Sequence, residues 1–276
     1  MKTPTGLPDY HVHTFRCGHA GGESRDFVRR ALDRGLGEMA FTDHIPLYFL
    51  PSEARDPRLA MREEDLDGYL AEVAALADEF RGEIPVRLGL EADYAEGHEE
   101  TLRRWLDRAD WDLVLGSVHW VAGDWIDAPE SASRRFAEEG VDALYAEYYR
   151  LLARAARTGL FDVLTHFDLP KKHGHRPARP LEEAEEEAIS AARASGCAVE
   201  ISSAGLRKPV AEAYPEARLL RRIVAAGVPV TFSSDAHAPA EVGWGYDRTR
   251  ALARACGVTE FVTLEKRRKI RHPLPA

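Results

Sequence analysis

The stretch 8–20, PDYHVHTFRCGHA, places three histidines in and just after a candidate strand, and it sets the pattern that decides the fold. An amphipathic helical segment follows it at 24–34. The arrangement returns along the chain, because EMAFTDH at 38–44 and FDVLTH at 161–166 also end an apolar run in a histidine. We therefore interpret the chain as repeated strand–helix units with polar side chains at the strand ends.

The rest of the sequence continues this alternation and predicts an α/β barrel. Candidate strands lie at 8–14, 38–42, 86–90, 113–118, 161–165, 198–201 and 228–232, with a last one near 261–264. Candidate helices lie between them at 24–34, 63–80, 100–109, 141–157, 181–194, 215–226 and 248–255. Such alternation forms parallel βαβ units, and seven or eight units favour a closed barrel over an open sheet. No linker rich in Gly, Ser or Pro divides residues 1–276, so we expect a single domain.

Two longer stretches, 46–61 and 121–140, interrupt this rhythm, and each follows a candidate strand. Loops that follow strands form the active face of a barrel, and both stretches are long for such loops. They are candidates for loops that enclose a substrate. Plain surface excursions are the alternative.

Composition places the chain among ordinary globular proteins. Of its 276 residues 45% are hydrophobic and 30% charged, and the mean hydropathy is -0.37. No apolar run is long enough to span a membrane, and the first ten residues lack the features of a signal peptide, so we expect a cytoplasmic protein without membrane partners. The net charge of -9 disfavours a nucleic-acid partner, since proteins that bind nucleic acid usually present a basic surface.

The cysteines and the missing amides characterise the environment of the protein. Cys17, Cys197 and Cys256 are odd in number and form no CxxC pair, which indicates a reducing compartment. Cys17 is either a buried filler or a residue at the edge of a metal site. The chain contains no Asn and no Gln, and Arg exceeds Lys. This pattern predicts a thermophilic source, although GC-rich codon usage would produce part of it.

Seven of the eleven histidines and three carboxylates follow candidate strand ends. They are His11, His13, His19, Asp43, His44, Glu91, His119, His166, Asp235 and His237. One histidine at a strand end is usually a hydrogen-bonded polar residue, but seven in phase with carboxylates indicate a metal site. Side chains alternate along a strand, so His11 and His13 point the same way, and ligands from other strands complete the site at the barrel end.

Seven motifs carry a resemblance to a known family. They are DYHVHTFRCGHA at 9–20, MAFTDHIP at 39–46, LGLEADY at 88–94, GSVHWV at 116–121, LTHFDLPKKHG at 164–174, EISSAGLRK at 200–208 and VTFSSDAH at 230–237. In this order they resemble the PHP (polymerase and histidinol phosphatase) superfamily, and most closely its histidinol-phosphate phosphatases. The resemblance spans roughly residues 8–247. It implies a distorted (β/α)7 barrel, the TIM-barrel-like PHP fold.

The same resemblance implies three divalent metal ions. One ion would be held by His11, His13, Glu91 and Asp235, and Glu91 would bridge to a second. His119 and His166 would complete the coordination of the second ion. A third ion would be held by His19, His44 and His237. Asp43 would lie close by as a hydrogen-bond acceptor or occasional ligand. Imidazole and carboxylate ligands suit Zn, Fe or Mn.

The implied reaction is hydrolysis of a phosphomonoester, L-histidinol phosphate, to L-histidinol and phosphate in histidine biosynthesis. Paired metals lower the pKa of a shared water from about 15.7 toward 7. We expect a metal-bridging hydroxide to attack phosphorus in line, with no phosphoenzyme. Asp43, Asp235 and His237 are the predicted catalytic residues, and either Asp235 or His237 would aid proton transfer to the leaving alkoxide.

Substrate contacts are assigned to residues that follow the strand-end motifs. Lys171, Lys172 and Arg207 are candidates to hold phosphate, with solvated loop charges as the alternative for the lysines. Glu200 is a candidate for the substrate's cationic groups. Ser202 is either substrate-facing or structural. We expect the remaining histidines to lie in exposed loops or at the surface. They are His98, His173, His175 and His272.

Two other functions stay open. A PHP-type nuclease or general phosphoesterase would use the same ligands, but the acidity of the chain counts against it. A non-catalytic, metal-stabilised binding module is the second alternative, and the complete ligand set disfavours it. No GxSxG, P-loop or GxGxxG motif supports another catalytic class.

Overall fold

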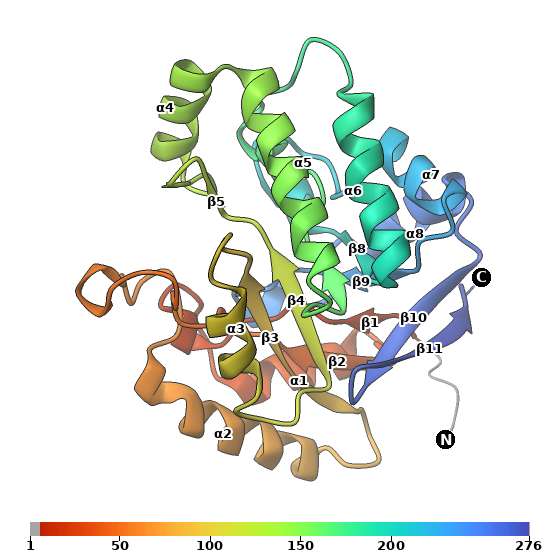
Figure 1. Ribbon diagram of the computed structural model, residues 1–276. Helices are drawn as coiled ribbons and strands as arrows, with labels where there is room; N and C mark the ends of the chain where they lie inside the picture. Colours follow the sequence, from red (N-terminus) through yellow and green to blue (C-terminus); the bar gives the residue numbers. More distant parts are fainter. Residues whose placement is uncertain (1–5, 276) are drawn as a thin grey trace.

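Seven parallel strands form the central sheet of the computed structural model, which describes residues 6–275 (Figure 1). Neighbours in the sheet follow one another in chain order. The strands are β1 Pro8–Asp9, β2 Glu38–Phe41, β3 Val86–Asp93, β4 Leu113–Ser117, β7 Val163–Leu164, β8 Ala198–Ser202 and β9 Val230–Ser233. The sheet nearly closes, because Val12 pairs in parallel with Ala236 and the Ala236 N–H donates to the His11 carbonyl at 2.9 Å. The predicted seven-stranded (β/α) barrel is confirmed.

Helices connect the strands and cover the outside of the barrel (Figure 1). They are α1 Ser24–Asp33, α2 Leu66–Glu79, α3 Glu99–Leu106, α4 Pro129–Glu139, α5 Val141–Arg157, α6 Glu182–Ser195, α7 Ala217–Ala225 and α8 Tyr246–Ala255. Short 3-10 helices lie at η1 Phe15–Cys17, η2 Ser52–Ala54, η3 Glu63–Asp65, η4 Leu169–His173, η5 Ala204–Arg207 and η6 Pro239–Glu241. Helix α2 shows why these segments are helical, since Leu66, Tyr69, Val73 and Leu76 recur at helical spacing and are buried. None of the helices between residues 6 and 275 combines the length and apolar character of a membrane span.

Two strand predictions need correction. The first strand, expected over 8–14, is regular only at Pro8–Asp9, because its continuation bends toward β9 to close the barrel. The segment near 261–264 is not a barrel strand. It belongs to β10 Glu260–Glu265, which pairs antiparallel with β11 Arg268–Pro273 in a separate hairpin. A short apolar run such as 261–264 looks the same in a barrel strand and in a hairpin strand that packs against the barrel.

The β10–β11 hairpin covers the base of the barrel, the end at which the strands begin. Val262 and Leu264 of β10 belong to the apolar cluster that fills the barrel there, with Tyr10, Ala40, Leu113, Leu115, Val163 and Ala198. The hairpin turn is fixed by Arg267, which donates to the Asp162 carboxylate at 2.9 Å and to the Leu160 carbonyl at 2.6 Å. This end of the barrel is therefore closed.

The long stretch 121–140 is not a plain loop, which corrects the sequence interpretation. It contains most of a small hairpin, β5 Trp120–Val121 and β6 Asp124–Trp125, and helix α4. Trp125 packs with Leu47 and Ala60 of the other long stretch. The two stretches are therefore in contact and form one wall beside the open end of the barrel.

Candidate metal centre

The predicted ligands gather at the mouth of the barrel, the end at which the strands finish. Parallel strands bring all their carboxyl ends to the same face, so residues far apart in sequence meet there. His11 and His13 come from the segment after β1, His44 from the residues after β2, and Glu91 from β3. The remaining strand-end residues of this group are His119, His166, Asp235 and His237.

The Glu91 carboxylate lies at the centre of this group. Its Oε2 is 3.0 Å from His11 Nε2 and 3.0 Å from His44 Nδ1. Its Oε1 is 3.2 Å from His166 Nε2 and 3.8 Å from His119 Nε2. The two oxygens face different sets of imidazoles, which is the arrangement of a carboxylate shared between two metal ions.

Asp235 supplies a second carboxylate beside His13. Its Oδ1 is 3.3 Å from His13 Nε2 and 3.5 Å from His237 Nδ1. The backbone φ of Asp235 is +50°, a conformation that non-glycine residues seldom adopt and that structures retain where a side chain must be held in place. Arg207 stabilises this turn by donating to the carbonyls of Ser234 and Asp235 at 2.9 and 3.0 Å.

A third group consists of His19, His44 and His237, whose ligand atoms lie within 4.8 Å of one another. His19 Nδ1 lies 2.9 Å from the carbonyls of both Cys17 and Arg58, so this nitrogen carries the ring proton. The lone pair of His19 Nε2 then faces His237 Nε2, at a distance of 3.0 Å. A metal ion that binds both nitrogens would satisfy them together.

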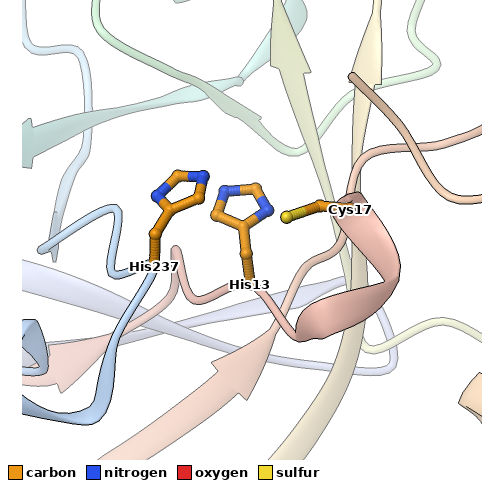
Figure 2. Close-up of side chains that lie close together, drawn as sticks. All are labelled: His13, Cys17 and His237. Atoms are coloured by element: carbon orange, nitrogen blue, oxygen red, sulfur yellow. The ribbon is translucent and has the colours of Figure 1, made fainter. Parts of the chain in front are cut away.

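Cys17 borders the centre. Its side chain, His13 and His237 point toward one another (Figure 2), and their ligand atoms lie within 4.8 Å. The thiol is fully buried, and burial raises the pKa of Cys17 to about 12, so the sulfur carries its proton. Cys17 is therefore both a buried filler and a neighbour of the ligands. The other two cysteines are also buried, and all three are free, which agrees with the lack of a CxxC pair in the sequence.

Several ligand atoms are buried without a hydrogen-bond partner. They are His11 Nε2, both ring nitrogens of His13, His44 Nδ1 and Glu91 Oε2. A buried unpaired polar atom costs about 1–3 kcal/mol, and native structures contain few. Two ligands about 2.1 Å from a tetrahedral ion lie about 3.4 Å apart, and the nitrogen–oxygen distances around His11 and His13 run from 3.0 to 3.7 Å. The residues therefore fit divalent metal ions.

The protonation states of the carboxylates agree with this fit. Burial alone would raise the pKa of Glu91, but the imidazole of His11 holds it well below its usual range. The same balance of burial and His11 lowers the pKa of Asp235. Burial, followed by the imidazole of His237, holds the pKa of His13 well below its usual range. The carboxylates are thus ionised and His13 is neutral, the states that metal ligands need. Burial would lower the pKa of His11, but the charge of Glu91 raises it well above its usual range, so His11 would have to lose a proton to bind a metal ion.

Asp93 is a supporting residue that the sequence analysis missed. Its Oδ1 lies 2.9 Å from His119 Nδ1 and accepts the His119 backbone N–H at 3.0 Å. This contact directs His119 Nε2 toward Glu91. Burial would lower the pKa of His119, but the Asp93 charge raises it to about 9. Asp93 follows Glu91 by two residues on the same strand face, so the period-two rule could have identified it.

Asp43, predicted to be catalytic, lies behind His13. It is fully buried and accepts hydrogen bonds from the backbone N–H and the hydroxyl of Thr14, the former at 2.6 Å. Its Oδ1 is 3.8 Å from His13 Nδ1. Burial raises the pKa of Asp43 to about 7. The geometry favours the role of a hydrogen-bond acceptor over that of a ligand.

Glu200, predicted to contact substrate, is 1% exposed and is surrounded by protein groups. Its Oε2 lies 3.1 Å from His11 Nδ1 and accepts from the Ser233 hydroxyl at 2.6 Å. Its Oε1 accepts from the His166 backbone N–H at 2.6 Å. Glu200 therefore joins a residue on one side of Glu91 to a residue on the other. This geometry favours a role in holding the ligands over the predicted contact with substrate.

The other predicted substrate contacts differ in availability. Arg207 keeps one buried guanidinium nitrogen, Nη1, without a partner beside Asp235. The Lys172 ammonium contacts the Asp127 carboxylate and lies 3.2 Å from the Asp127 carbonyl. Lys171 is 1% exposed, and its ammonium is enclosed by protein oxygens, which favours a structural role. Ser202 is buried and its hydroxyl accepts from a backbone N–H at 3.3 Å, which favours the structural alternative.

The remaining histidines lie away from these ligand groups. His98 is exposed, as predicted. The surface prediction for His272 is wrong, because it is 9% exposed and its Nε2 lies 2.7 Å from the Thr263 hydroxyl. The exposed-loop prediction is also wrong for His173 and His175, which are half-buried. His173 lies in η4, and its Nε2 is 3.1 Å from the carbonyl of Asp127 in the stretch 121–140. This contact with the wall explains why His173 is half-buried.

Comparison with known proteins places this geometry in context. The PHP domain model matches residues 9–204. The chain is 43% identical to a probable histidinol-phosphatase of Deinococcus radiodurans, over 88% of this chain and 90% of that protein. It is 27% identical to the histidinol-phosphatase of Bacillus subtilis, over 87% of this chain and 96% of the relative.

A solved structure shows the same fold. The crystal structure of histidinol phosphate phosphatase from Lactococcus lactis, complexed with zinc, L-histidinol and phosphate, superimposes with a TM-score of 0.81 at 21% identity. The match covers 96% of this chain and 98% of that one. The family model spans most of the strand-end ligands, and the relatives align along nearly the whole length of the chain. The chain therefore belongs to the PHP domain family.

Proposed function

We propose that this protein is a metal-dependent phosphomonoesterase that hydrolyses L-histidinol phosphate to L-histidinol and phosphate. The observation that carries the proposal is the placement of Glu91 between two sets of imidazoles, with a third set beside it. Relatives named histidinol-phosphatase in Deinococcus and Bacillus support the substrate. The net charge of -9 argues against nucleic acid as the substrate.

We assign the ligands to three ions as the family resemblance implies. His11, His13 and Asp235 would hold one ion that shares Glu91 with a second, and the second would be completed by His119 and His166. The third set is His19, His44 and His237. When bound, divalent ions would lower the pKa of a coordinated water and neutralise charge on the phosphoryl oxygens. Elemental analysis of protein grown with Zn, Fe or Mn would give the identity and number of ions.

The chain's own residues then orient the substrate and handle protons. The unpaired Arg207 Nη1 is placed to donate to a phosphoryl oxygen next to Asp235. His237 lies beside Asp235, and we keep these two as the candidates that aid proton transfer to the leaving alkoxide. Asp43 and Glu200 act behind the ligands, because their side chains are buried against Thr14 and against His11, respectively. Lys172 stays a candidate for phosphate, provided that it releases Asp127.

The test is phosphate release by purified protein loaded with each metal. We expect turnover of L-histidinol phosphate to exceed that of p-nitrophenyl phosphate, and no cleavage of single-stranded DNA. Turnover of DNA alone would replace the proposal with the nuclease alternative. A protein with full metal content that releases no phosphate from either ester would be a binding module.

The amino-acid composition supports one further part of the proposal. A chain without Asn or Gln fits a thermophilic source. Thermal unfolding of the metal-loaded protein would test this, because a midpoint in the ordinary mesophilic range, about 45–65 °C, would contradict it.

A further inference from the structure

One buried tyrosine next to the metal centre has no partner for its hydroxyl. Tyr214 is 2% exposed, and its OH makes no hydrogen bond. In the part of the chain that the structure describes, seven other tyrosines donate to a carbonyl or carboxylate oxygen. They are Tyr10, Tyr48, Tyr69, Tyr94, Tyr145, Tyr148 and Tyr246. Since a buried hydroxyl without a partner is destabilising, the Tyr214 hydroxyl requires an explanation.

The backbone fixes Tyr214 at the carboxyl end of β8. Ser202 N–H donates to the Tyr214 carbonyl at 2.7 Å, and Tyr214 N–H donates to the Ser202 carbonyl at 3.0 Å. The intervening chain folds back closely at Gly205, where a Cβ would lie 2.1 Å from the Glu212 carbonyl oxygen and 3.0 Å from the Tyr214 ring. Glycine is therefore needed at 205 for the ring to occupy this position.

The surroundings of the ring place the hydroxyl beside the centre. The Tyr214 ring stands edge-on to the His166 ring, with 6.4 Å between centroids. The Lys171 ammonium lies 5.2 Å from the ring centroid. Burial raises the pKa of Tyr214 well above its usual range, and the charges of Asp127, Asp168 and Asp235 add to this. The ring therefore packs against His166, a predicted ligand of the second ion, and the unpaired hydroxyl lies in the field of nearby carboxylates.

We propose that the Tyr214 hydroxyl donates a hydrogen bond to a phosphoryl oxygen of the bound phosphomonoester. The inference rests on the proposed function and adds a residue to it. A tyrosine hydroxyl is an uncharged donor at neutral pH, so it stabilises a phosphoryl oxygen without repelling metal ions. No proton is transferred and no covalent bond forms at Tyr214. Because water is excluded from this buried position, the hydrogen bond from the Tyr214 hydroxyl is stronger there than it would be in solvent.

Tyr214→Phe is the direct test, because it removes one oxygen and keeps the ring. We expect kcat/KM for L-histidinol phosphate to fall about 10- to 100-fold, the usual range for a hydrogen bond to a charged group. The inhibition constant for inorganic phosphate should rise by a similar factor. The melting temperature should stay the same or rise, since the hydroxyl has no partner in the free protein. Metal content should not change.

Tyr145→Phe is the matched control. The Tyr145 hydroxyl donates to the His175 carbonyl at 2.7 Å, so its removal should lower the melting temperature and leave kcat/KM within twofold. Wild-type turnover is measured first, and its absence would count against the proposed function instead of against Tyr214. If the wild type is active and the kcat/KM of the Tyr214→Phe variant is unchanged, the inference is overturned. A buried water would then be the partner of the hydroxyl.

Two further outcomes would also overturn it. If kcat/KM falls while the phosphate inhibition constant is unchanged, the hydroxyl contacts the alcohol part of the substrate. If the melting temperature and the metal content fall together, Tyr214 acts by supporting His166.

Discussion

The two ends of the barrel bury polar groups in opposite ways. At the mouth, ring nitrogens of His11, His13 and His44 are buried without hydrogen-bond partners. At the base, polar side chains of similar burial are joined in a chain of contacts: Leu264 N–H donates to the Tyr10 hydroxyl at 2.7 Å, and this hydroxyl donates to Glu38. The unpaired ring nitrogens thus cluster at the mouth, where the proposed ions would bind, whereas the polar groups at the base are largely paired, with Arg87 Nε as an exception.

This difference separates two kinds of buried carboxylate. Glu91 and Asp235 at the mouth face imidazoles and have their pKa values lowered despite burial. Glu38 at the base has its pKa raised to about 7, because burial outweighs the charge of Arg87. If the comparison is correct, substitutions at the mouth should change activity and metal content, whereas substitutions at the base should change stability.

The largest effect is expected for Glu91→Gln. The amide keeps the volume but removes the charge that both sets of imidazoles share, so activity should fall about 1000-fold or more. Metal content, measured by elemental analysis, should fall with it. The melting temperature in the presence of chelator should differ little from that of the chelated wild type, because the stabilisation lost is that of bound metal. A variant with full metal content and normal turnover would refute the assigned centre.

Glu200→Gln sharpens the comparison, since Glu200 is a buried carboxylate at the mouth with several polar contacts. The amide nitrogen would face His11 Nδ1 and favour the tautomer that protonates Nε2, so metal affinity should fall about 10- to 100-fold. Competition with a chelator measures this, and excess metal should restore much of kcat. Ser233→Ala is the control, because it removes the other contact to Glu200 Oε2 without reversing the tautomer. Equal metal affinity in both variants would contradict the role of a positioning residue.

At the base, Arg267→Met should act on stability alone. The variant loses the bonds to Asp162 and to the Leu160 carbonyl, which should lower the free energy of unfolding by about 1–3 kcal/mol. Denaturant unfolding measures the change, and kcat should stay within twofold. Arg271→Met on the same hairpin is the control: its ion pair with Glu260 is exposed, and such pairs contribute about 0–1 kcal/mol. A loss of activity in Arg267→Met would show that the two ends are coupled.

The same division explains what could be predicted from the sequence. The convergence of the strand-end residues was predictable, because parallel strands bring residues such as His11 and His166 to one face whatever the details of packing. The β10–β11 hairpin was not predictable, because the short apolar run at 261–264 does not specify whether its partner strand is parallel or antiparallel. Tyr214 and Asp127 were missed because they reach the site from loops, whose path no periodic pattern records.

Glu200 shows a different limit. The candidate strand at 198–201 correctly contained it, yet its carboxylate contacts His11 and the His166 backbone N–H and does not face the predicted substrate. Alternation tells which face of a strand a side chain occupies, but it does not tell how deep in the barrel it lies. The depth depends on the tilt of the strands and on the volumes of the neighbours.

The last test is the pH dependence of the stability of Glu38→Gln, which changes one buried carboxylate at the base. In the folded protein the pKa of Glu38 is raised from its ordinary 4.5 to about 7, so the native state binds more protons than the unfolded state between these values. Wild-type stability should therefore fall relative to the variant as pH rises from 4.5 to 7, by about 3 kcal/mol at most. Arg87 opposes this loss, but it lies 3.4 Å from Glu38 and is also shared with Glu265 at 2.9 Å. Urea unfolding of both proteins across this range decides: a variant that becomes relatively less stable at high pH would mean that the Arg87 pair outweighs burial.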